Sequence, residues 1–470
     1  MTAESQRPAP SIAYSITVRL HAPAGGAAIS QLTSAVERVG GSVTALDVSG
    51  SGGEKLQIDV TIGASSTEHA DELVAALREL PDIEVGRVSD RTFLMHLGGK
   101  ISMESKHPIR NRDDLSLIYT PGVARVCRAI ADNPEDARRL TIKRNSVAVV
   151  TDGTAVLGLG NIGPEAAMPV MEGKAALFHR FGEIDAWPIA LDTTDTEEII
   201  TAVKNLAPGF GGINLEDISA PRCFEIEERL RDLLDIPVFH DDQHGTAIVV
   251  LAALLNALRV VDKELPSVRI VMSGAGAAGT AILKLLLAAG ATNVCVADID
   301  GLIHRGRPGL ESSLQWIAEH TNPDNLSGPL TAALAGADVF IGVSAPNILT
   351  GDDIATMADR AVVFALANPI PEIDPVEAAR YAEVVATGRS DFANQINNVL
   401  VFPGVFRGLL DAQSNQITQD MLLAAARALA AVVTDDELNA SYITPSVFHP
   451  EVHTEVAEAV REAAKQAATA

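Results

Sequence analysis

VRIVMSGAGAAGTAILKLLLAAGATNVCVAD, at residues 268–298, is the stretch that decides the fold of this chain most clearly. It consists of an apolar strand, a glycine turn, a helix and a second apolar strand, the order of a βαβ unit. The turn matches G-x-G-x-x-G at Gly274, Gly276 and Gly279, and such glycines let a pyrophosphate approach a helix N-terminus. Asp298 ends the second strand, where a carboxylate can accept hydrogen bonds from ribose hydroxyls. The stretch predicts a Rossmann-type dinucleotide site, and a purely structural glycine turn is the weaker alternative.

Asp298 also bears on the choice of cofactor. A carboxylate at this position repels a 2′-phosphate, and the next residues, Ile299 and Asp300, supply no cation. NAD is therefore favoured over NADP. Arg305 and Arg307 follow closely enough to leave NADP open as the alternative.

A second match to the glycine pattern, GLGNIG at residues 158–163, lies upstream. The segment before it resembles a hairpin and not a strand that runs directly into a helix. The context therefore favours a structural role for this loop and assigns the dinucleotide to the later one.

Apolar strands alternate with helical segments from about residue 145 to 410, which is typical of α/β architecture with largely parallel sheets. A helix at 245–260 ends the first run of strands, and we place a domain boundary near residue 262. The segments 419–432 and 451–469 are rich in alanine and predict helices that pack back on the body. The strands expected in the first run are SVAVVTDG, IDAWPIALD, GGINLED and IPVFHDD.

The N-terminal part has a different pattern, with the order βαββαβ. That order is typical of a small ferredoxin-like module, in which both helices cover one face of an antiparallel sheet. The Ser/Gly-rich stretch 49–53 would be its central hairpin. The module resembles the ACT family of regulatory domains, so we expect a small effector to bind near residues 25–45. The expected strands are 13–20, 42–48, 55–62 and 83–88, and the expected helices are 28–39 and 68–80.

Four carboxylates follow two of the expected strands. Glu216 and Asp217 close GGINLED, and Asp241 and Asp242 close IPVFHDD. The carboxyl ends of strands in an open α/β sheet meet at the edge where ligands bind, and converging carboxylates suit Mg²⁺ or Mn²⁺. Acids at strand ends also serve as helix N-caps, which is the alternative for Asp242 in particular.

Lys174 lies on an apolar stripe of the helix expected at 164–180. One interpretation is a structural lysine that extends to solvent. The other is a desolvated general base whose pKa is lowered toward neutrality. Taken singly, Tyr119 in its Tyr-Thr-Pro-Gly turn, and Asn368 and Asn398 among apolar residues, would be packing or turn residues.

The composition excludes several classes of protein. A formal net charge of −25, without a cluster of lysine or arginine, argues against nucleic-acid binding. Cys127, Cys223 and Cys295 form no C-x-x-C pair and indicate neither a disulfide framework nor a zinc ribbon. Residues 1–11 lack the apolar core of a signal peptide, and no uninterrupted apolar run reaches membrane-spanning length, so we expect a cytoplasmic protein.

An ordered set of motifs runs through about residues 100–410. The motifs are YTPGVA at 119–124, TDG and GLGNIG at 152–163, MEGKAALF at 171–178, NLEDI at 214–218, VFHDDQHGTA at 238–247, GAGAAG at 274–279, ANPIPEI at 367–373 and NQINNVLVFPG at 394–404. The set resembles the malic enzyme family. With the ACT-like module in front, the likeness is closest to short bacterial NAD-dependent members that carry an added regulatory domain.

The resemblance implies oxidative decarboxylation of (S)-malate to pyruvate and CO₂, with NAD and with Mn²⁺ or Mg²⁺. Lys174 would be the general base, Tyr119 the acid that protonates the enolpyruvate carbon, and Asp241 a residue that orients this proton relay. The implied metal ligands are Glu216, Asp217 and Asp242. The implied cofactor contacts are Gly274, Gly276, Ala277, Ala278, Gly279, Asp298 and Asn368, and the implied substrate contacts are Asn368 and Asn398.

The predicted fold class is therefore α/β with three domains, a number that also suits the length of 470 residues. The domains are an ACT-like α+β module at 1–95, a catalytic and metal-binding domain at 96–262, and a Rossmann-type NAD-binding domain with C-terminal helices at 263–470. Both resemblances imply a homodimer or a higher homo-oligomer.

One position departs from the family pattern. Larger members carry an arginine just before the first glycine loop that pairs with a malate carboxylate, whereas this chain has Ala155, as the short forms generally do. Two alternative functions stay open. One is a malolactic enzyme, which converts malate to lactate with the same residues, and the other is a catalytically silent regulator that binds an effector.

Overall fold

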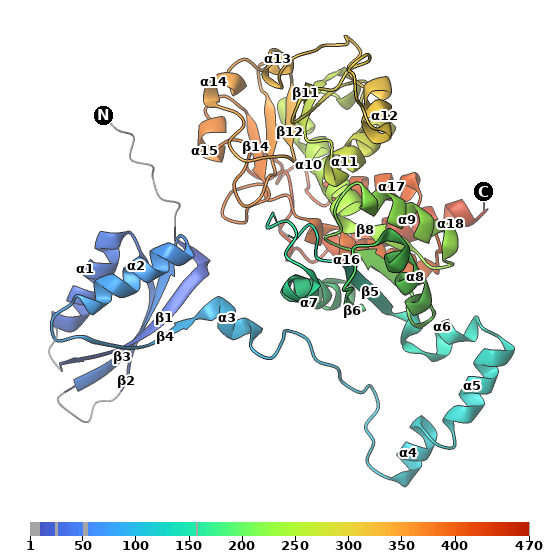
Figure 1. Ribbon diagram of the computed structural model, residues 1–470, viewed down its shortest axis with the longest axis horizontal. Helices are drawn as coiled ribbons and strands as arrows, with labels where there is room; N and C mark the ends of the chain where they lie inside the picture. Colours follow the sequence, from blue (N-terminus) through green and yellow to red (C-terminus); the bar gives the residue numbers. More distant parts are fainter. Residues whose placement is uncertain (1–9, 24–26, 50–54, 157, 470) are drawn as a thin grey trace. The chain divides into compact units, whose positions relative to one another are not determined.

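The computed structural model describes residues 10–23, 27–49, 55–156 and 158–469. The chain forms two compact units, Met1–Ser102 and Met103–Ala470, and each is described by itself (Figure 1). The hairpin predicted at 49–53 falls almost entirely outside the described residues.

The first unit has the βαββαβ order that the sequence predicts. Its elements are β1 (Ser11–Pro23), α1 (Ala27–Val39), β2 (Ser42–Ser49), β3 (Lys55–Ala64), α2 (Thr67–Arg78) and β4 (Glu84–Asp90), followed by α3 (Arg91–His96). The strands form one antiparallel sheet in the order β2-β3-β1-β4, the ferredoxin-like arrangement. Both α1 and α2 lie on one face of this sheet (Figure 1), and Leu32, Leu73 and Ile62 are completely buried in its core.

The second unit begins with three short helices. They are α4 (Arg112–Ile118), α5 (Val123–Asp132) and α6 (Asp136–Leu140). None of their residues is buried. Within this unit, α4 and α5 project away from the two sheets (Figure 1).

A parallel four-stranded sheet follows, with the strand order β6-β5-β7-β8. Its elements are η1 (Ile142–Arg144), β5 (Ser146–Thr151), α7 (Pro164–Gly182), β6 (Asp185–Ala190), α8 (Thr196–Leu206), η2 (Ala207–Gly209), β7 (Gly212–Leu215), α9 (Arg222–Leu233) and β8 (Val238–His240). Every residue of β5, β7 and β8 is buried, which explains why these strands are nearly continuous apolar runs in the sequence.

The second sheet has six strands in the order β11-β10-β9-β12-β13-β14, all parallel except β11. Its elements are β9 (Arg269–Ser273), α11 (Ala277–Ala288), β10 (Asn293–Asp298), β11 (Gly301–Leu302), α12 (Ser312–His320), α13 (Thr331–Leu334), β12 (Val339–Gly342), α14 (Gly351–Ile354), β13 (Val362–Ala365), α15 (Pro375–Ala378) and β14 (Val384–Thr387). The strand order reverses between β9 and β12, and ligands bind at such a switch point in open α/β sheets. The predicted Rossmann-type sheet is therefore confirmed.

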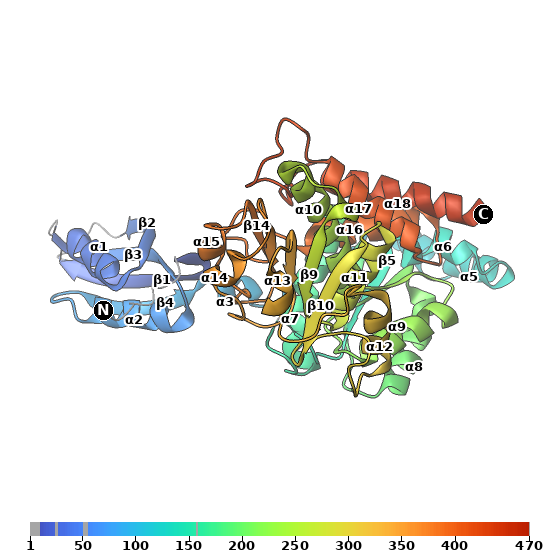
Figure 2. The same cartoon turned by 90° about the horizontal axis from the view of Figure 1, so that it is seen from above.

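The remaining helices cover the sheets. They are η3 (Asp241–Gly245), α10 (Thr246–Val261), η4 (Leu265–Ser267), η5 (Asn398–Leu400), α16 (Phe402–Ala412), α17 (Gln419–Ala431) and α18 (Val452–Thr469). Figure 2 shows α16, α17 and α18 gathered with α10, and the contacts among these helices confirm that the C-terminal segments pack back on the body.

The helical stretch Asp241–Val261 is long and apolar enough to cross a membrane by length and composition, although no uninterrupted apolar run of that length is expected from the sequence. Most of this stretch is buried inside the second unit, where α10 belongs to the largest apolar core. A buried core helix passes the same test of length and composition, so the finding is weak evidence for a membrane span.

Candidate active site

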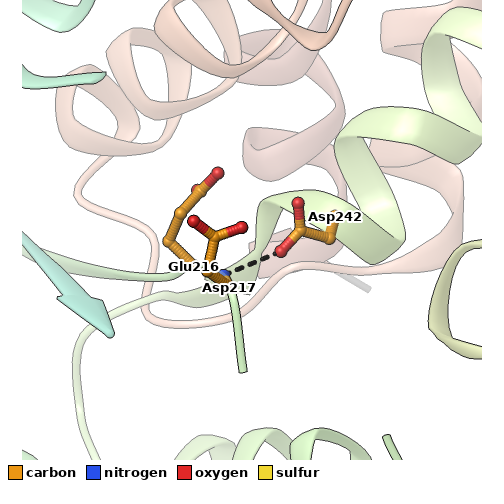
Figure 3. A group of neighbouring side chains, drawn as sticks. All are labelled: Glu216, Asp217 and Asp242. Carbon is orange, nitrogen blue, oxygen red and sulfur yellow. Dashed lines mark hydrogen bonds between the residues drawn. The ribbon is translucent and has the colours of Figure 1, made fainter. Parts of the chain in front are cut away.

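Two pairs of acids come together where β7 and β8 end. Glu216 and Asp217 follow β7, and Asp241 and Asp242 follow β8, its parallel neighbour. Figure 3 shows Glu216, Asp217 and Asp242 side by side, and one carboxylate oxygen from each lies within 4.8 Å of the others. Such a triad of hard oxygen donors could hold a divalent cation.

Asp242 does not cap the helix that follows it. A π-helical turn, Asp241–Gly245, precedes α10, and Gly245 at the helix N-cap makes no side-chain capping bond. The Asp242 Oδ2 atom instead accepts a hydrogen bond of 2.9 Å from the backbone N–H of Asp217 (Figure 3). The interpretation of Asp242 as a helix cap is therefore wrong, because the π turn directs its carboxylate to the neighbouring strand end.

Lys174 reaches this cluster from α7. Its Nζ atom lies 2.8 Å from Glu216 Oε1 and 2.5 Å from Asp241 Oδ2, and 11% of its side chain is exposed. A lysine that extends to solvent is therefore excluded. Burial acts to lower the pKa of Lys174, but the nearby carboxylates outweigh burial and raise it overall. The predicted lowering of this pKa is wrong for the present arrangement, because the apolar stripe in the sequence reveals the burial and not the acids that face it.

The cluster holds more negative than positive charge, since four carboxylates face one ammonium. Burial raises the pKa of Glu216 well above its ordinary value, Lys174 opposes this shift, and the neighbouring carboxylates add to it. Glu216 Oε2 accepts a hydrogen bond of 2.8 Å from Asn214 Nδ2. A bound cation stabilises carboxylates that are crowded in this way, so the donor set fits Mg²⁺ or Mn²⁺.

Asp241 and Asp242 have different surroundings. The Asp241 side chain is fully buried against Lys174, and its Oδ2 also accepts a hydrogen bond of 3.1 Å from Asn398 Nδ2. Asn398 Oδ1 in turn accepts a bond of 3.1 Å from the Thr246 hydroxyl. A Cβ on Gly245 would collide with Asp241 Oδ1, so this close packing requires glycine there. The amide of Asn398 therefore fixes Asp241 in place beside the lysine.

The later glycine loop connects β9 to α11 at the switch point of the second sheet. A Cβ on Gly274 would lie 2.7 Å from the Val343 carbonyl oxygen, and one on Gly279 would collide with the carbonyl of Gly274. A Cβ on Gly276 would meet no atom within 4 Å. Close packing therefore requires the outer two glycines, whereas Gly276 borders open space that a pyrophosphate could enter.

Helix α11 brings this loop beside the acids. Ala277 and Ala278 form its first turn, and Ala277 packs against the apolar core of the four-stranded sheet. The helix also contacts the π turn that carries Asp241 and Asp242. The dinucleotide loop and the acidic cluster therefore share a border, although they belong to different sheets.

Asp298 lies at the end of β10 and is paired with Arg307. Both guanidinium Nη atoms of Arg307 approach Asp298 at 2.9 Å, and Nη2 also lies 3.2 Å from Asp300. The sequence leaves open that Arg307 contacts the 2′-phosphate of NADP. In the structure its guanidinium is held by two carboxylates.

The earlier glycine loop packs against the strand end that carries Asn368. A Cβ on Gly158 would lie 2.5 Å from the Asn368 carbonyl oxygen, and Val156 forms an isolated antiparallel bridge to Gly160. Asn368 itself lies beside Gly388, close to the carboxyl end of β14. The described part of this loop therefore packs closely at Gly158, and the structural role that its context favours stays a prediction. Just before it, Ala155 donates its backbone N–H to the Asp217 carbonyl and supplies no cation.

Tyr119 is the one predicted catalytic residue that is not in the cluster. It follows α4 and is 68% exposed as a residue, whereas the side chain of Lys174 is 11% exposed. A phenol exposed to this degree is not enclosed in the same pocket as the buried lysine. Within its own chain, Tyr119 is therefore separate from the other predicted catalytic groups.

Two further buried carboxylates hold the site together, and the sequence patterns single out neither. Asp152 is fully buried and accepts a hydrogen bond of 2.8 Å from Arg222. Glu372 accepts backbone bonds of 2.9 Å from Ser344 and 3.0 Å from Ala367, so it joins the loops that follow β12 and β13. Both acids lie inside quoted motifs, and an acid within an otherwise apolar run is the signal that points to them.

Two family models match consecutive parts of the chain. One, described as malic enzyme, N-terminal domain, matches residues 98–231, and the other, malic enzyme, NAD binding domain, matches residues 243–465. Lys174, Glu216 and Asp217 lie in the first matched region, and Asp242 lies directly before the second.

Individual relatives agree with these matches. The chain is 58% identical to an NAD-dependent malic enzyme of Geobacillus stearothermophilus, over 96% of this chain and 95% of that one. It is 52% identical to a bifunctional malic/malolactic enzyme of Bacillus subtilis, over 79% of this chain and 91% of that one. A crystal structure of an NAD-dependent malic enzyme from Thermotoga maritima superimposes with a TM-score of 0.77 at 50% identity, covering 79% of this chain and 99% of that one.

Proposed function

This chain belongs to the malic enzyme family, and on that premise we propose that it oxidises (S)-malate with NAD and decarboxylates the product to pyruvate and CO₂. The observation that carries the proposal is the contact of Lys174 with Asp241 and Glu216, next to the dinucleotide loop. Oxidation of a hydroxy acid needs a proton acceptor at the hydroxyl and a hydride acceptor beside the carbon. The arrangement offers a place for each.

Glu216, Asp217 and Asp242 would hold Mn²⁺ or Mg²⁺, which fits the excess of negative charge in the cluster. When bound, the cation supplies polarisation of the substrate oxygen and stabilises the negative charge left by the departing CO₂. Asp242 is partly exposed, so the triad is open to solvent on its side.

Lys174 takes the hydroxyl proton as hydride passes to the nicotinamide. It must be neutral to do so, and Asp241, 2.5 Å away, is placed to accept the ammonium proton beforehand. Asn398 keeps Asp241 in this position and contacts the substrate, and Asn368 contacts both substrate and nicotinamide. After CO₂ leaves, Tyr119 protonates the enolpyruvate carbon and regains its proton from Lys174.

A malate assay with Mn²⁺, run in parallel with NAD and NADP and with EDTA as the control, tests this function. We expect NADH and pyruvate to form in equal amounts, NAD to be preferred, and EDTA to abolish the reaction. Turnover that EDTA leaves unchanged would contradict the metal assignment, and absence of any malate turnover would contradict the function itself.

Malolactic activity is the second candidate, because the Bacillus subtilis relative is named as bifunctional for malic and malolactic reactions. The two reactions differ in their products. Lactate formed without net NADH would indicate the malolactic reaction, whereas pyruvate with stoichiometric NADH would indicate the malic reaction alone.

The regulatory, assembly and localisation assignments belong to the same proposal. A small effector would bind the ACT-like module of the first unit, the protein would be a homodimer or a higher homo-oligomer, and it would act in the cytoplasm. Deletion of residues 1–95 tests the regulatory part. We expect malate turnover to remain and the response to effectors to disappear, and an intact response would contradict the assignment.

A further inference from the structure

One buried acid holds the π turn from outside. Glu227 lies on α9, is 5% exposed and has no part in the proposed chemistry. Its Oε1 atom accepts a hydrogen bond of 3.3 Å from the backbone N–H of His240, the last residue of β8. His244 Nε2 lies 2.7 Å from the same oxygen, and it donates because an ionised carboxylate only accepts. One oxygen of Glu227 therefore connects the residue before the π turn with the fourth residue of the turn.

The segment held in this way carries two acids that point in different directions. Asp241 faces Lys174 at 2.5 Å, whereas Asp242 accepts the backbone N–H of Asp217 at the end of the neighbouring strand. A π turn is a rare conformation, and its shape decides where each of its side chains points. The directions of Asp241 and Asp242 therefore depend on the contacts that fix the two ends of the turn.

The ring of His240 lies between the backbone that Glu227 holds and the metal triad. The residue is completely buried, and its Nδ1 atom lies 3.8 Å from Asp242 Oδ2. Neither ring nitrogen has a hydrogen-bond partner among the residues that the structure describes. The position of the ring beside Asp242 therefore depends on the backbone of His240, to which Glu227 is bonded.

A carboxylate that only satisfies a histidine is the simpler explanation, and two observations argue against it. The side chain of His244 is 19% exposed and lines a surface pocket with residues of α9 and α11, where water could satisfy the imidazole. Burial acts to raise the pKa of Glu227, but His244, His240 and Arg231 outweigh burial and lower it overall. An ionised acid is costly to bury, so an imidazole that water can reach does not account for it.

We propose that Glu227 is a positioning residue for the metal site. By holding His240 and His244, it sets the shape of the π turn, and the turn directs Asp242 toward the cation and Asp241 toward Lys174. Glu227 itself is not among the ligands and acts through the turn. The inference rests on the proposed function, in which Glu216, Asp217 and Asp242 bind Mn²⁺ or Mg²⁺.

Direct binding of Mn²⁺ to the purified full-length protein, without malate or NAD, tests the proposal. Electron paramagnetic resonance of free Mn²⁺ gives the Kd. Glu227→Leu removes the acceptor and keeps an apolar side chain of similar size, so we expect the Kd to rise about tenfold, the scale for groups that orient metal ligands. A Kd equal to that of the wild type would overturn the proposal.

Two further variants of α9 make the measurement specific. Glu227→Gln keeps an oxygen acceptor at the same place and should recover most of the wild-type affinity for Mn²⁺. Glu228→Leu makes the same change at the next residue, an exposed acid, and should leave the Kd unchanged. An equal loss of affinity in Glu228→Leu would overturn the proposal, because the effect would then come from the surface charge of α9.

The partner of Glu227 supplies a second test that does not depend on Glu227→Leu folding. His244→Leu changes a partly exposed side chain and should also raise the Kd for Mn²⁺, because it removes one of the two bonds to Glu227. The double variant should bind Mn²⁺ no more weakly than Glu227→Leu alone, since the two groups act through one contact. Losses that simply add in the double variant would contradict this shared action.

Stability measured in EDTA separates positioning from a purely structural role. If Glu227 only supports the fold, Glu227→Leu should lower the free energy of unfolding and leave the Kd of the folded protein unchanged, which would overturn the proposal. Failure of the proposed function gives a different result. A wild-type protein that binds no Mn²⁺ would contradict the metal assignment itself, whereas wild-type binding that Glu227→Leu does not weaken would contradict only the role of Glu227.

Discussion

The two parallel sheets of the second unit place carboxylates at the same structural position and surround them differently. At the ends of β7 and β8 the acids are largely buried and face one ammonium, that of Lys174. At the end of β10, Asp298 is paired with Arg307, and both side chains are largely buried as well. The comparison teaches that an acid at a strand end gains its role from its counter-charge. Four crowded carboxylates around one ammonium suit a metal cation, whereas a carboxylate with its own guanidinium partner suits recognition of a neutral ribose.

Removal of Lys174 should have the largest effect, because among the described residues it is the one ammonium in the acidic cluster of the four-stranded parallel sheet. We expect Lys174→Ala to lower kcat by about 10³-fold or more, in the range for loss of a general base. The measurement is steady-state malate oxidation at saturating metal, with Lys204→Ala, an exposed lysine on α8, as the matched control. Unchanged turnover in Lys174→Ala would mean that the cluster is not catalytic.

Neutralising the two acids of the β8 end one at a time should separate metal binding from proton relay. Asp242→Asn should raise the Mn²⁺ concentration needed for half activity by about tenfold or more, because it weakens one of three ligands. Asp241→Asn should lower kcat and leave the Mn²⁺ requirement nearly unchanged, since Asp241 faces Lys174. The measurement is a Mn²⁺ titration of activity for both variants. Equal effects on the metal requirement would contradict the division of roles.

At the six-stranded sheet, disruption of the Asp298–Arg307 pair should change which cofactor is used and leave the chemistry intact. Asp298→Ser removes the charge that repels a 2′-phosphate and one of the two carboxylates that hold Arg307, which leaves more of its guanidinium available to a phosphate. We expect kcat/KM for NADP to rise about tenfold, a change of about 1.4 kcal/mol. Parallel kinetics with NAD and NADP measure the ratio, and Asp420→Ser, an exposed acid on α17, should leave it unchanged. A ratio that does not move in Asp298→Ser would show that this pair does not select the cofactor.

The main strands of the two parallel sheets could be predicted from sequence. Buried parallel strands are apolar runs, and polar residues mark where each run ends. The positions of Glu216, Asp217, Asp241 and Asp242 at strand ends follow from that pattern alone. The domain boundaries at 95 and 262 stay predictions, as does kinship of the first unit with ACT domains. Its ferredoxin-like topology could be predicted, since six alternating segments leave few arrangements of the sheet.

What the sequence could not supply is the set of contacts between distant segments. The raised pKa of Lys174 depends on acids that follow it by dozens of residues. The π turn that redirects Asp242 has no strong local signature, because its residues are compatible with an ordinary helix start. The separation of Tyr119 from Lys174 could not be predicted from the sequence either, because motifs give the order of residues along the chain and not their distances in space.

The smallest effect we predict concerns a buried histidine beside α7 that has no counter-charge among the residues that the structure describes. His453 on α18 stacks on Phe181 of α7 at 4.5 Å, and burial lowers its pKa to about 4 from an ordinary 6.5. Between those pH values the unfolded chain binds a proton that the folded chain does not, so stability should fall as the pH drops from about 6.5 to about 4.

The change should be about 2 kcal/mol in the free energy of unfolding. Replacement of the imidazole by a ring that does not titrate should therefore flatten the pH dependence. Denaturant unfolding of wild type and His453→Phe at pH 7 and pH 4.5 measures the difference, and His107→Ala, an exposed histidine, should keep the wild-type slope. If the free energy of unfolding changes with pH in His453→Phe as it does in the wild type, the lowered pKa of His453 is not the cause of that change. Burial would then not separate the two groups as we expect, with the pKa of His453 lowered by burial and the pKa of Lys174 raised by the acids that face it.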